Sequence, residues 1–507
     1  MSIAKSESLF SLVKSLSKSE KKSFRLYAER IHESQQLLYM QLFDLYDKQK
    51  KLDEVEIKRQ LGNINATNYA NVKRHLYEQI LTSLRLVNKN KKSNIRLSEM
   101  IDFAYILYGK GLYMQALKIL EKAKKFAKQH HRDLSILNII EIEKMIHSRH
   151  ITRSKLKPIN NLLEEAADKA ATLLSTVKLS NLKIALHKFY IEKGHVRNKE
   201  EETEVKNFFV ANLPDVKENE LDKIERIYLY QSYVWYYYIL NDFTKCSKYA
   251  LKWVNMYENN TDLQARDVNL YFRAYHYLLT SLFNKKEKEN YLEHYAEIEQ
   301  FRKLNYAKFN QNTKIISFLY VHSARLNLHI LRGDYTKAHD DIKKTLVRLQ
   351  RYKSFLDEHK VMVFYFKIAW IYLASGNPSS SAKYLQEITN MTNKTLRLDI
   401  QAYARLMFLM VHYELDNTII LPSLIKKYKR FFEKNKINNS VQLLFLEFFI
   451  KMLKAPLLDR KKIIHTYIQL FRKSENNRYE KRTFLYLDFV IWLESRFQHT
   501  TIESLAS

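Results

Sequence analysis

Glycine and proline are scarce in this chain, and their scarcity restricts the available folds more than any other feature. Only 6 Gly and 5 Pro occur among 507 residues, whereas 46% of the residues are hydrophobic. Sheets and loop-rich folds need many more turn residues, because tight turns depend on glycine and proline. The sequence therefore predicts an all-α protein with more than roughly 70% helix and almost no strand.

The clearest local pattern is a helical hairpin at 365–385, which reads YFKIAWIYLASGNPSSSAKYL. Large residues recur at helical spacing, and the small residue Ala369 lies where a second helix must come close. Gly376 is expected to end the first helix, because glycine adopts the left-handed conformation at least steric cost, and Pro378 follows it. One such unit cannot bury its apolar face alone, so the hairpin predicts neighbours of the same kind.

Three further stretches repeat this order of large, small and turn residues. Their turns lie at Gly111, at Asn241-Asp242 and at Gly333, and Cys246 occupies a small-residue position after the second of them. The order resembles the tetratricopeptide (TPR) repeat, in a degenerate form similar to lysine- and tyrosine-rich bacterial proteins. The resemblance implies an α-solenoid of antiparallel hairpins over residues 97–497, and a non-catalytic scaffold or regulator that binds a peptide or protein segment in its concave groove.

The resemblance also implies which residues face that groove, because in TPR domains the first helix of each hairpin lines it. The positions are Tyr105, Tyr108, Tyr228, Gln231, Trp235, Tyr238, Asn327, Phe366 and Trp370. Aromatic rings with a polar tip suit a surface that is wet on one side and apolar on the other. The alternative is that these rings belong to the core of a chain with 35 Tyr and 27 Phe. If Trp235 and Trp370 line a ligand surface, both should be partly exposed.

Residues 1–95 lack the repeat pattern and predict a separate N-terminal helical block. Ser17 and Glu20 have the spacing of a capping box, and Asp53 is expected to cap a short helix that Gly62 ends. Residues 53–88 also allow a helix-turn-helix, whose second helix would offer polar side chains to nucleic acid. These side chains are Asn71, Lys73, Arg74, His75 and Gln79. The alternative is a plain helical cap for the array.

The net charge of +30 leaves two interpretations open. A strongly positive protein attracts polyanions, so the charge is compatible with a nucleic-acid partner. The abundance of Lys, Asn, Ile and Tyr also fits a bias toward AT-rich codons, and the basic residues are spread along the chain.

No motif predicts catalysis, a metal site or a cofactor. The pairs His130-His131 and His147/His150 lack carboxylate or cysteine partners at zinc-site spacing, and six glycines leave no phosphate-binding loop. Cys246 is the single cysteine and is expected to be buried like an alanine. The N-terminus is polar, and no apolar run is long enough to cross a membrane, so we expect a soluble cytoplasmic protein, with residues 498–507 as a C-terminal tail.

Overall fold

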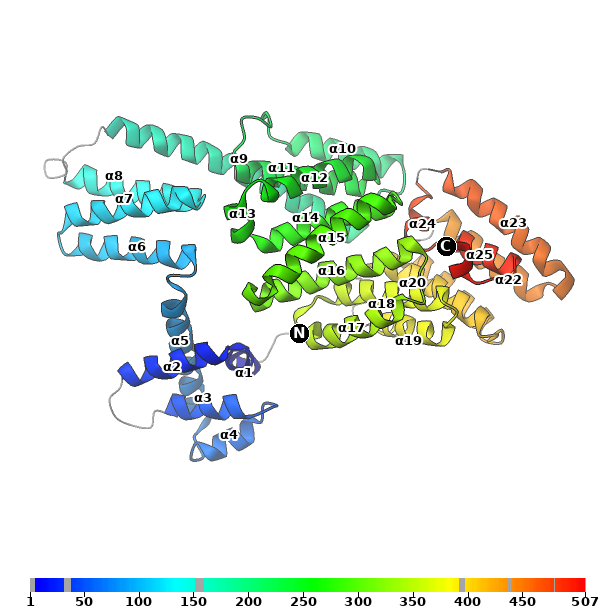
Figure 1. Cartoon of the computed structure of the whole chain (residues 1–507), viewed down its shortest axis with the longest axis horizontal. Helices are drawn as coiled ribbons and strands as arrows, with labels where there is room; N and C mark the ends of the chain where they lie inside the picture. Colours follow the sequence, from blue (N-terminus) through cyan, green and yellow to red (C-terminus); the bar gives the residue numbers. More distant parts are fainter. Residues whose placement is uncertain are drawn as a thin grey trace. The chain divides into compact units, whose positions relative to one another are not determined.

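The structure is a computed structural model that describes residues 5–31, 38–150, 159–391, 397–435, 437, 439–477 and 479–506. Helices account for 83% of it, and the described residues contain no strand, which confirms the predicted all-α class (Figure 1). Within the same residues, no helix combines the length and the apolar character needed to cross a membrane.

The chain divides into two compact units, 1–173 and 174–507, and the division lies within α9 (Ile159–Lys193). The expected boundary near residue 96 differs from this division, because α6, α7 and α8 pack on one another within the first unit. The earlier helices of unit 1 are α1 (Lys5–Ser15), α2 (Lys18–Ile31), α3 (Leu38–Lys48), α4 (Glu54–Gln60), α5 (Ala66–Asn88), α6 (Ser93–Gly109), α7 (Tyr113–Gln129) and α8 (Asp133–Arg149).

Unit 2 contains the remaining helices, together with two short 3-10 turns at Tyr306–Lys308 and Lys353–Phe355. Its helices after α9 are α10 (Lys199–Asn212), α11 (Lys223–Ile239), α12 (Phe243–Glu258), α13 (Thr261–Arg266), α14 (Val268–Asn284), α15 (Lys288–Asn305), α16 (Gln311–Arg332), α17 (Ala338–Tyr352), α18 (Glu358–Ala374), α19 (Pro378–Thr389), α20 (Leu398–Glu414), α21 (Leu421–Asn435), α22 (Ser440–Lys454), α23 (Leu457–Glu475), α24 (Arg482–Tyr486), α25 (Phe489–Phe497) and α26 (Ile502–Ala506).

Local signals in the N-terminal block form as expected. The Ser17 backbone N–H donates to a carboxylate oxygen of Glu20 at 2.8 Å, and the Glu20 N–H donates to the Ser17 hydroxyl at 3.3 Å. The carboxylate of Asp53 accepts from two backbone N–H groups in the first turn of α4. Helices α1 to α5 bury a common core that includes Leu42, Tyr46 and other apolar side chains. Capping satisfies backbone N–H groups that have no partner inside the helix, so these ends follow from the sequence alone.

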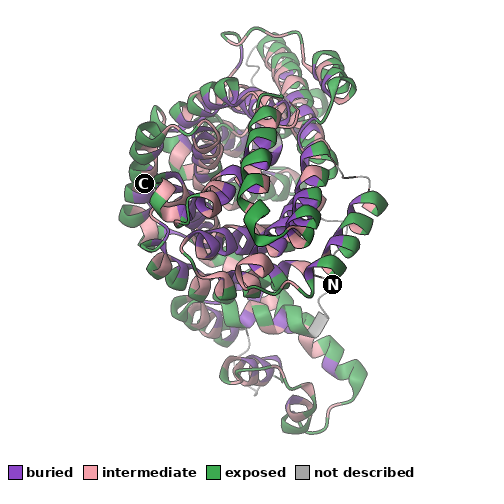
Figure 2. Cartoon of the chain, turned by 90° about the vertical axis from the view of Figure 1, so that its right-hand side faces the viewer, coloured by how far each residue is buried: buried purple, intermediate pink, exposed green. Residues whose placement is uncertain are grey.

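Consecutive helices of unit 2 pair, and the first helices of successive pairs also touch. The pairs α11/α12, α14/α15, α16/α17, α18/α19, α20/α21 and α22/α23 are each in contact. In addition, α14 contacts α16, α16 contacts α18, α18 contacts α20, and α20 contacts α22. Buried residues concentrate on the sides of the helices that face their neighbours, whereas the outer sides are exposed (Figure 2). This arrangement places one helix of each pair in a continuous row.

Small residues stand at the closest helix contacts. Ala369 of α18 and Ser381 of α19 are both fully buried, and the Ser381 hydroxyl donates to the Ala369 carbonyl at 2.8 Å. Cys246 of α12 is fully buried as expected, and Ala338 of α17 is fully buried as well. The turn between α18 and α19 has Gly376 at φ +77°, in the left-handed region that glycine adopts readily. The hairpin predicted at 365–385 is therefore present with the expected close contact.

The substitution Ala369→Leu should destabilise the protein by about 1–3 kcal/mol, because three extra carbon atoms must fit between α18 and α19. Thermal and urea unfolding would measure the loss. The matched control is Gln386→Leu, which puts the same side chain on an exposed position of α19 and should change stability by about 0.5 kcal/mol or less. An Ala369→Leu protein as stable as the control would contradict this packing.

The expected C-terminal tail contains a short helix that packs on unit 2. Ile502 of α26 is 3% exposed, and Glu503 accepts a hydrogen bond from the backbone N–H of Thr336 at 2.8 Å. A Cβ atom added to Gly333 would lie 2.7 Å from both the Cβ and the carbonyl oxygen of Ala506. Gly333 is therefore needed both for its positive φ of +76° and for the close approach of α26.

Comparison of Gly333→Ala with Gly376→Ala should separate the effect of the positive φ from the effect of the close approach of α26. Both positions have positive φ, but no atom lies within 4 Å of the Cβ position at Gly376. Gly376→Ala should therefore cost only the backbone penalty of about 1–2 kcal/mol. Gly333→Ala should cost more, as measured by urea unfolding. In a chain that ends at residue 501 the two costs should become similar, and equal costs in the full-length chain would argue against the docking of α26.

Candidate functional site

Aromatic side chains from successive helices of unit 2 contact one another and form a continuous run. His187 of α9 lies 4.6 Å from Trp235 of α11, measured between ring centroids, and Trp235 lies 5.1 Å from Tyr277 of α14. His276 of α14 stacks on Tyr320 of α16 with a centroid separation of 4.6 Å. The run therefore extends across four helices that are not consecutive in sequence.

Three cationic side chains contact residues of the same helices. The Lys183 ammonium lies 5.5 Å from the centroid of the Tyr228 ring, and the Arg273 guanidinium donates to the Tyr320 hydroxyl at 3.3 Å. Lys367 of α18 donates to the Ser323 hydroxyl at 2.6 Å. We call the resulting surface the inner face, and define it as Lys183, His187, Tyr228, Trp235, Tyr238, Arg273, His276, Tyr277, Tyr320, Lys360 and Lys367.

The row of helices that carries the inner face returns toward α9. In a flat row, four successive packings of α9, α11, α14, α16 and α18 at 8–10 Å each would separate α9 from α18 by about 30–40 Å. Yet Lys360 of α18 is close enough to His187 of α9 that, after burial, it contributes most to lowering the pKa of that imidazole. The Arg397 guanidinium, just before α20, lies 5.4 Å from the centroid of the Tyr190 ring on α9. The row of helices therefore curves back on itself, with these side chains on the inside.

The surrounding protein desolvates the cations of the inner face. Burial lowers the pKa of Lys367 to about 7. Burial, followed by repulsion from Arg273 and Arg397, lowers the pKa of Lys360 to about 8. Burial and Arg273 also lower the pKa of Lys183. These groups keep contact with solvent, and Arg273 and His187 are exposed. Side chains that keep some contact with solvent but have lost much of their hydration are expected where helices face one another across a narrow space.

The four cations form no ion pair among the described residues. Lys360 interacts with Asp357, an exposed carboxylate three residues earlier, but not as an ion pair. Around Arg325 in unit 2, by contrast, buried charges are paired. Glu299 accepts from Arg302 at 2.7 Å and from Arg325 at 2.8 Å, and Arg325 also contacts Asp341 at 3.2 Å.

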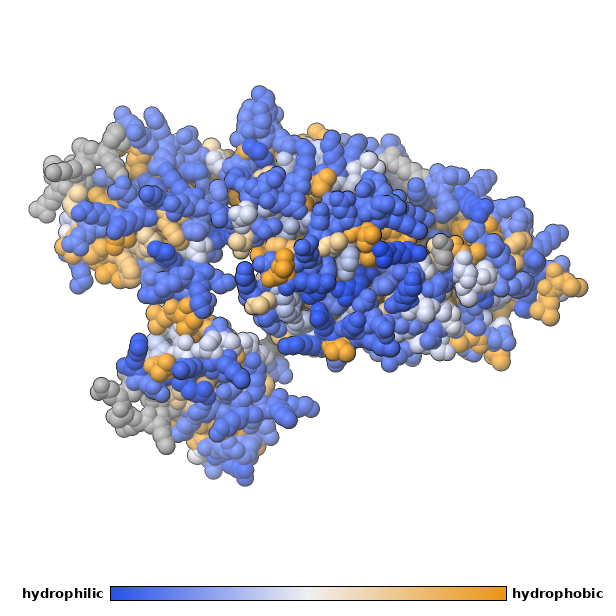
Figure 3. Space-filling model, viewed as in Figure 1, coloured by the Kyte–Doolittle hydropathy of each residue, from blue (hydrophilic) through white to orange (hydrophobic). Residues whose placement is uncertain are grey.

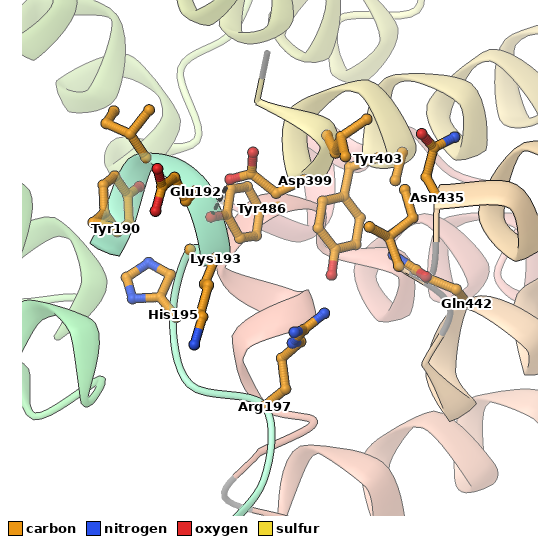
Figure 4. Close-up of a pocket in the computed structure, with 15 residues that line it drawn as sticks. Tyr190, Glu192, Lys193, His195, Arg197, Asp399, Tyr403, Asn435, Gln442 and Tyr486 are labelled. Atoms are coloured by element: carbon orange, nitrogen blue, oxygen red, sulfur yellow. Dashed lines mark hydrogen bonds between the residues drawn. The ribbon is translucent and has the colours of Figure 1, made fainter. Parts of the chain in front are cut away.

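A separate cavity of about 260 Å³ lies where the C-terminal end of α9 meets α20 and Tyr486 (Figure 4). Arg397 donates to Asp399 at 2.9 and 2.7 Å, and the Tyr486 hydroxyl donates to Asp399 at 2.7 Å. These contacts hold the pKa of Asp399 well below its usual range although burial acts in the opposite direction. Lys193, at the rim, pairs with Glu204 at 2.7 Å. The cavity lies where the two ends of the helix row meet. Its charged side chains pair with one another, so it offers little to a charged ligand.

The structure gathers three of the nine predicted groove residues on the inner face, namely Tyr228, Trp235 and Tyr238. Tyr238 contacts Trp235 at 5.9 Å between ring centroids. The other residues of unit 2 in this set are buried: Gln231 is 2% exposed, Asn327 7% and Phe366 8%. Asn327 is thus buried on α16, which packs on α15.

Tyr105 and Tyr108 lie on α6 in unit 1. Tyr105 is 47% exposed, beside the exposed side chains of Phe103 and Ile106, and the surface over α6 to α8 shows a gathering of apolar side chains (Figure 3). The Tyr108 hydroxyl accepts a hydrogen bond from Arg149 of α8 at 3.1 Å. Both residues belong to a different compact unit from the inner face.

Trp235 and Trp370 do not meet the condition of partial exposure that a role in lining a ligand surface sets. Each indole is only 7% exposed. Trp235 is enclosed by rings from α9 and α14, and Trp370 belongs to the same buried cluster as Tyr335, in the turn between α16 and α17.

The helices of the proposed helix-turn-helix form, but several of its polar side chains are engaged within unit 1. Lys73 pairs with Glu54 of α4 at 3.2 Å and lies 4.5 Å from the centroid of the Tyr69 ring. Gln79 accepts from the Tyr27 hydroxyl at 2.9 Å. His75 is exposed and contacts the edge of Tyr39, whereas Asn71 and Arg74 are exposed.

Cys246 packs in the core as a small residue, and His150 of the histidine pairs contacts a neighbouring ring. The Cys246 thiol is fully buried, accepts a hydrogen bond from Ser281 at 3.1 Å, and has its pKa raised to about 12 by burial. His150 stacks on Tyr113 at 3.6 Å. The described residues include no group of three or more His, Cys, Asp or Glu arranged to hold a metal ion.

Sequence reasoning missed the cations of the inner face, although a signal for two of them is present. Arg273 is the only Lys, Arg, Asp or Glu in α14, and Lys367 is the only one between Val361 and Ala374 of α18. A lone charge in an apolar helix is uncommon, because burying an unpaired charge is costly. That pattern could have identified α14 and α18 as helices with an unusual charged residue. It could not have predicted that the two cations lie close together.

Comparison with known protein families, curated proteins and solved structures finds no match to this chain. The function must therefore be argued from the inner face itself.

Lys367→Met should stabilise the protein by about 1–3 kcal/mol at pH 6, because it removes a charge that burial disfavours. The folded-state pKa of about 7 lies below the ordinary 10.5, so between these values the unfolded chain binds more protons. The stability of the unsubstituted protein should therefore rise with pH from about 7 to 10. Urea unfolding at pH 6, 8 and 10 would show a gain from Lys367→Met that shrinks as pH increases.

Lys383→Met is the control, since Lys383 is an exposed lysine on the paired helix α19. It should leave stability within about 0.5 kcal/mol at every pH. A Lys367→Met protein that is less stable at pH 6 would show that Lys367 is a structural group.

Proposed function

We propose that this protein is a non-catalytic scaffold or regulator in which a TPR-like α-solenoid binds a peptide or protein segment on its concave side. The observation that carries the proposal is the inner face, where cationic side chains that keep solvent contact lie beside aromatic rings from α9, α11, α14 and α16. Pairing of consecutive helices, and contact between the first helices of successive pairs, support the solenoid.

An extended segment suits this surface better than a folded domain. The two ends of the row approach each other, because His195 after α9 contacts Tyr486 with ring centroids 6.4 Å apart and Glu202 of α10 accepts from the Tyr479 hydroxyl at 2.7 Å. A narrow space between facing helices accommodates one extended peptide segment more readily than a folded domain. Tyrosine, histidine and arginine side chains are also well suited to binding polar backbone and side-chain groups.

Selection of binders from a random library of 12-residue peptides on the full-length chain tests this function. Fluorescence anisotropy would then compare each selected peptide on the unsubstituted protein and on the double variant His187→Ala, Tyr228→Ala. Both side chains retain solvent contact on the inner face, so their removal should weaken binding at least about tenfold with little change in melting temperature.

The matched control is His465→Ala, at an exposed histidine of α23. It should bind the selected peptides like the unsubstituted protein. Peptides whose affinity is the same for the double variant and the control would place binding elsewhere and refute this function, as would a failure to select any peptide.

A further inference from the structure

We infer that the segment bound on the inner face is acidic, with aspartate or glutamate side chains that pair with Lys183, Arg273, Lys360 and Lys367. This inference rests on the proposed function and specifies the chemistry of its ligand. Its basis is an imbalance of charge: four cations from three helices converge on one surface, and none of them forms an ion pair among the described residues.

Contacts with α16 place two of the cations near each other: Arg273 of α14 and Lys367 of α18 donate to Tyr320 and Ser323, which lie one turn apart on that helix. Arg273 lowers the pKa of Lys183 on α9 and of Lys360 on α18, although burial is the larger cause in each case. Lys360, Lys367 and Arg273 all lower the pKa of His276, again after burial. One stretch of ligand a few residues long can therefore reach several of these cations.

Hydrogen-bonding capacity remains at these groups. An ammonium has three N–H donors, and Lys367 uses two, toward the Ser323 hydroxyl at 2.6 Å and the Ser323 carbonyl at 3.4 Å. A guanidinium has five donors, and Arg273 uses its Nε toward Tyr320. Arginine presents the remaining donors as a planar fork that matches a carboxylate.

Structural roles explain these cations poorly. An internal anion would stabilise them, as Glu299 and Asp341 do for Arg325, but the described part of the chain supplies no such ion pair at the inner face. A ligand carboxylate that enters this hollow finds cations that have already lost much of their water, so less desolvation remains to oppose binding.

Peptide carboxylates fit the inner face better than nucleic acid does. Single-stranded nucleic acid is held by bases that stack on open aromatic faces. Here the faces are largely occupied, because His276 stacks on Tyr320 and Trp235 is enclosed by His187, Tyr190 and Tyr277. Trp235 and Tyr320 are only 7% and 8% exposed. What the face still offers is positive charge and N–H donors.

The test compares three fluorescein-labelled probes on the full-length protein by anisotropy: a 12-residue peptide of alternating Glu and Ala, the same peptide with Gln for Glu, and a 12-nucleotide oligothymidylate. The Glu peptide should bind at least about 100-fold more tightly than the Gln peptide, because hydrogen bonds to charged groups contribute about tenfold or more each. It should also bind more tightly than the oligothymidylate.

Two variants examine the inner face directly. Lys367→Met and Arg273→Gln should each weaken binding of the Glu peptide about tenfold or more, with melting temperatures equal to or above that of the unsubstituted protein for Lys367→Met. Lys383→Met removes the same charge from the exposed side of α19 and should change affinity less than about twofold. A variant that binds less while folding at least as stably separates ligand binding from a structural role.

Several results would overturn the inference. Equal binding of the Glu and Gln peptides, or equal losses from Lys367→Met and Lys383→Met, would show that the inner face does not select carboxylates. Tighter binding of the oligothymidylate, lost in Arg273→Gln, would assign the face to nucleic acid. Neutral library peptides that depend on His187 and Tyr228 would refute the acidic ligand and leave the proposed function standing, whereas library peptides independent of those residues would refute both.

Discussion

The close approach of paired helices at small residues is the constraint on which the rest of unit 2 depends. At Ala369 and Ser381, two helices come near enough for a side-chain hydroxyl to donate to the facing helix's carbonyl at 2.8 Å. Such contacts fix each pair, and contacts between α14, α16, α18 and α20 then set the pairs in a row. The inner face exists only because that row curves, since its cations come from helices that a flat layer would hold about 30–40 Å apart.

Local structure was predictable because its causes are local. Gly376, the capping box of Ser17 and Glu20, and the cap at Asp53 act within a few residues, and periodicity located the helices between them. The inner face was only partly predictable. Trp235 lies on it, but its burial depends on rings contributed by α9 and α14, and no glycine turn in the sequence fixes the register of α9. Curvature is a property of many helix contacts together, and no single stretch encodes it.

Unit 2 uses charge in two different ways. Around Arg325, buried charges compensate one another across α15, α16 and α17, and breaking such a pair costs about 3–5 kcal/mol because it leaves a lone buried charge. On the inner face the buried charges have no internal anion, so the folded protein is destabilised by their desolvation. The lowered pKa values of Lys360 and Lys367 reflect this desolvation. The first arrangement stabilises the fold, and the second lowers its stability.

That second arrangement is informative because stability and binding place opposite demands on a buried lysine. A methionine at position 367 would fill similar space without the cost of desolvating an ammonium, so packing gives no reason for a lysine there. Under the proposed function, an anionic ligand would make the charge favourable, and the free energy lost in the protein without ligand would be recovered as affinity. The Arg397–Asp399–Tyr486 contacts, which join α9 to the later helices, keep the opposite walls in place whether or not the face is occupied. A ligand of the proposed kind would therefore meet a surface that the fold has already assembled.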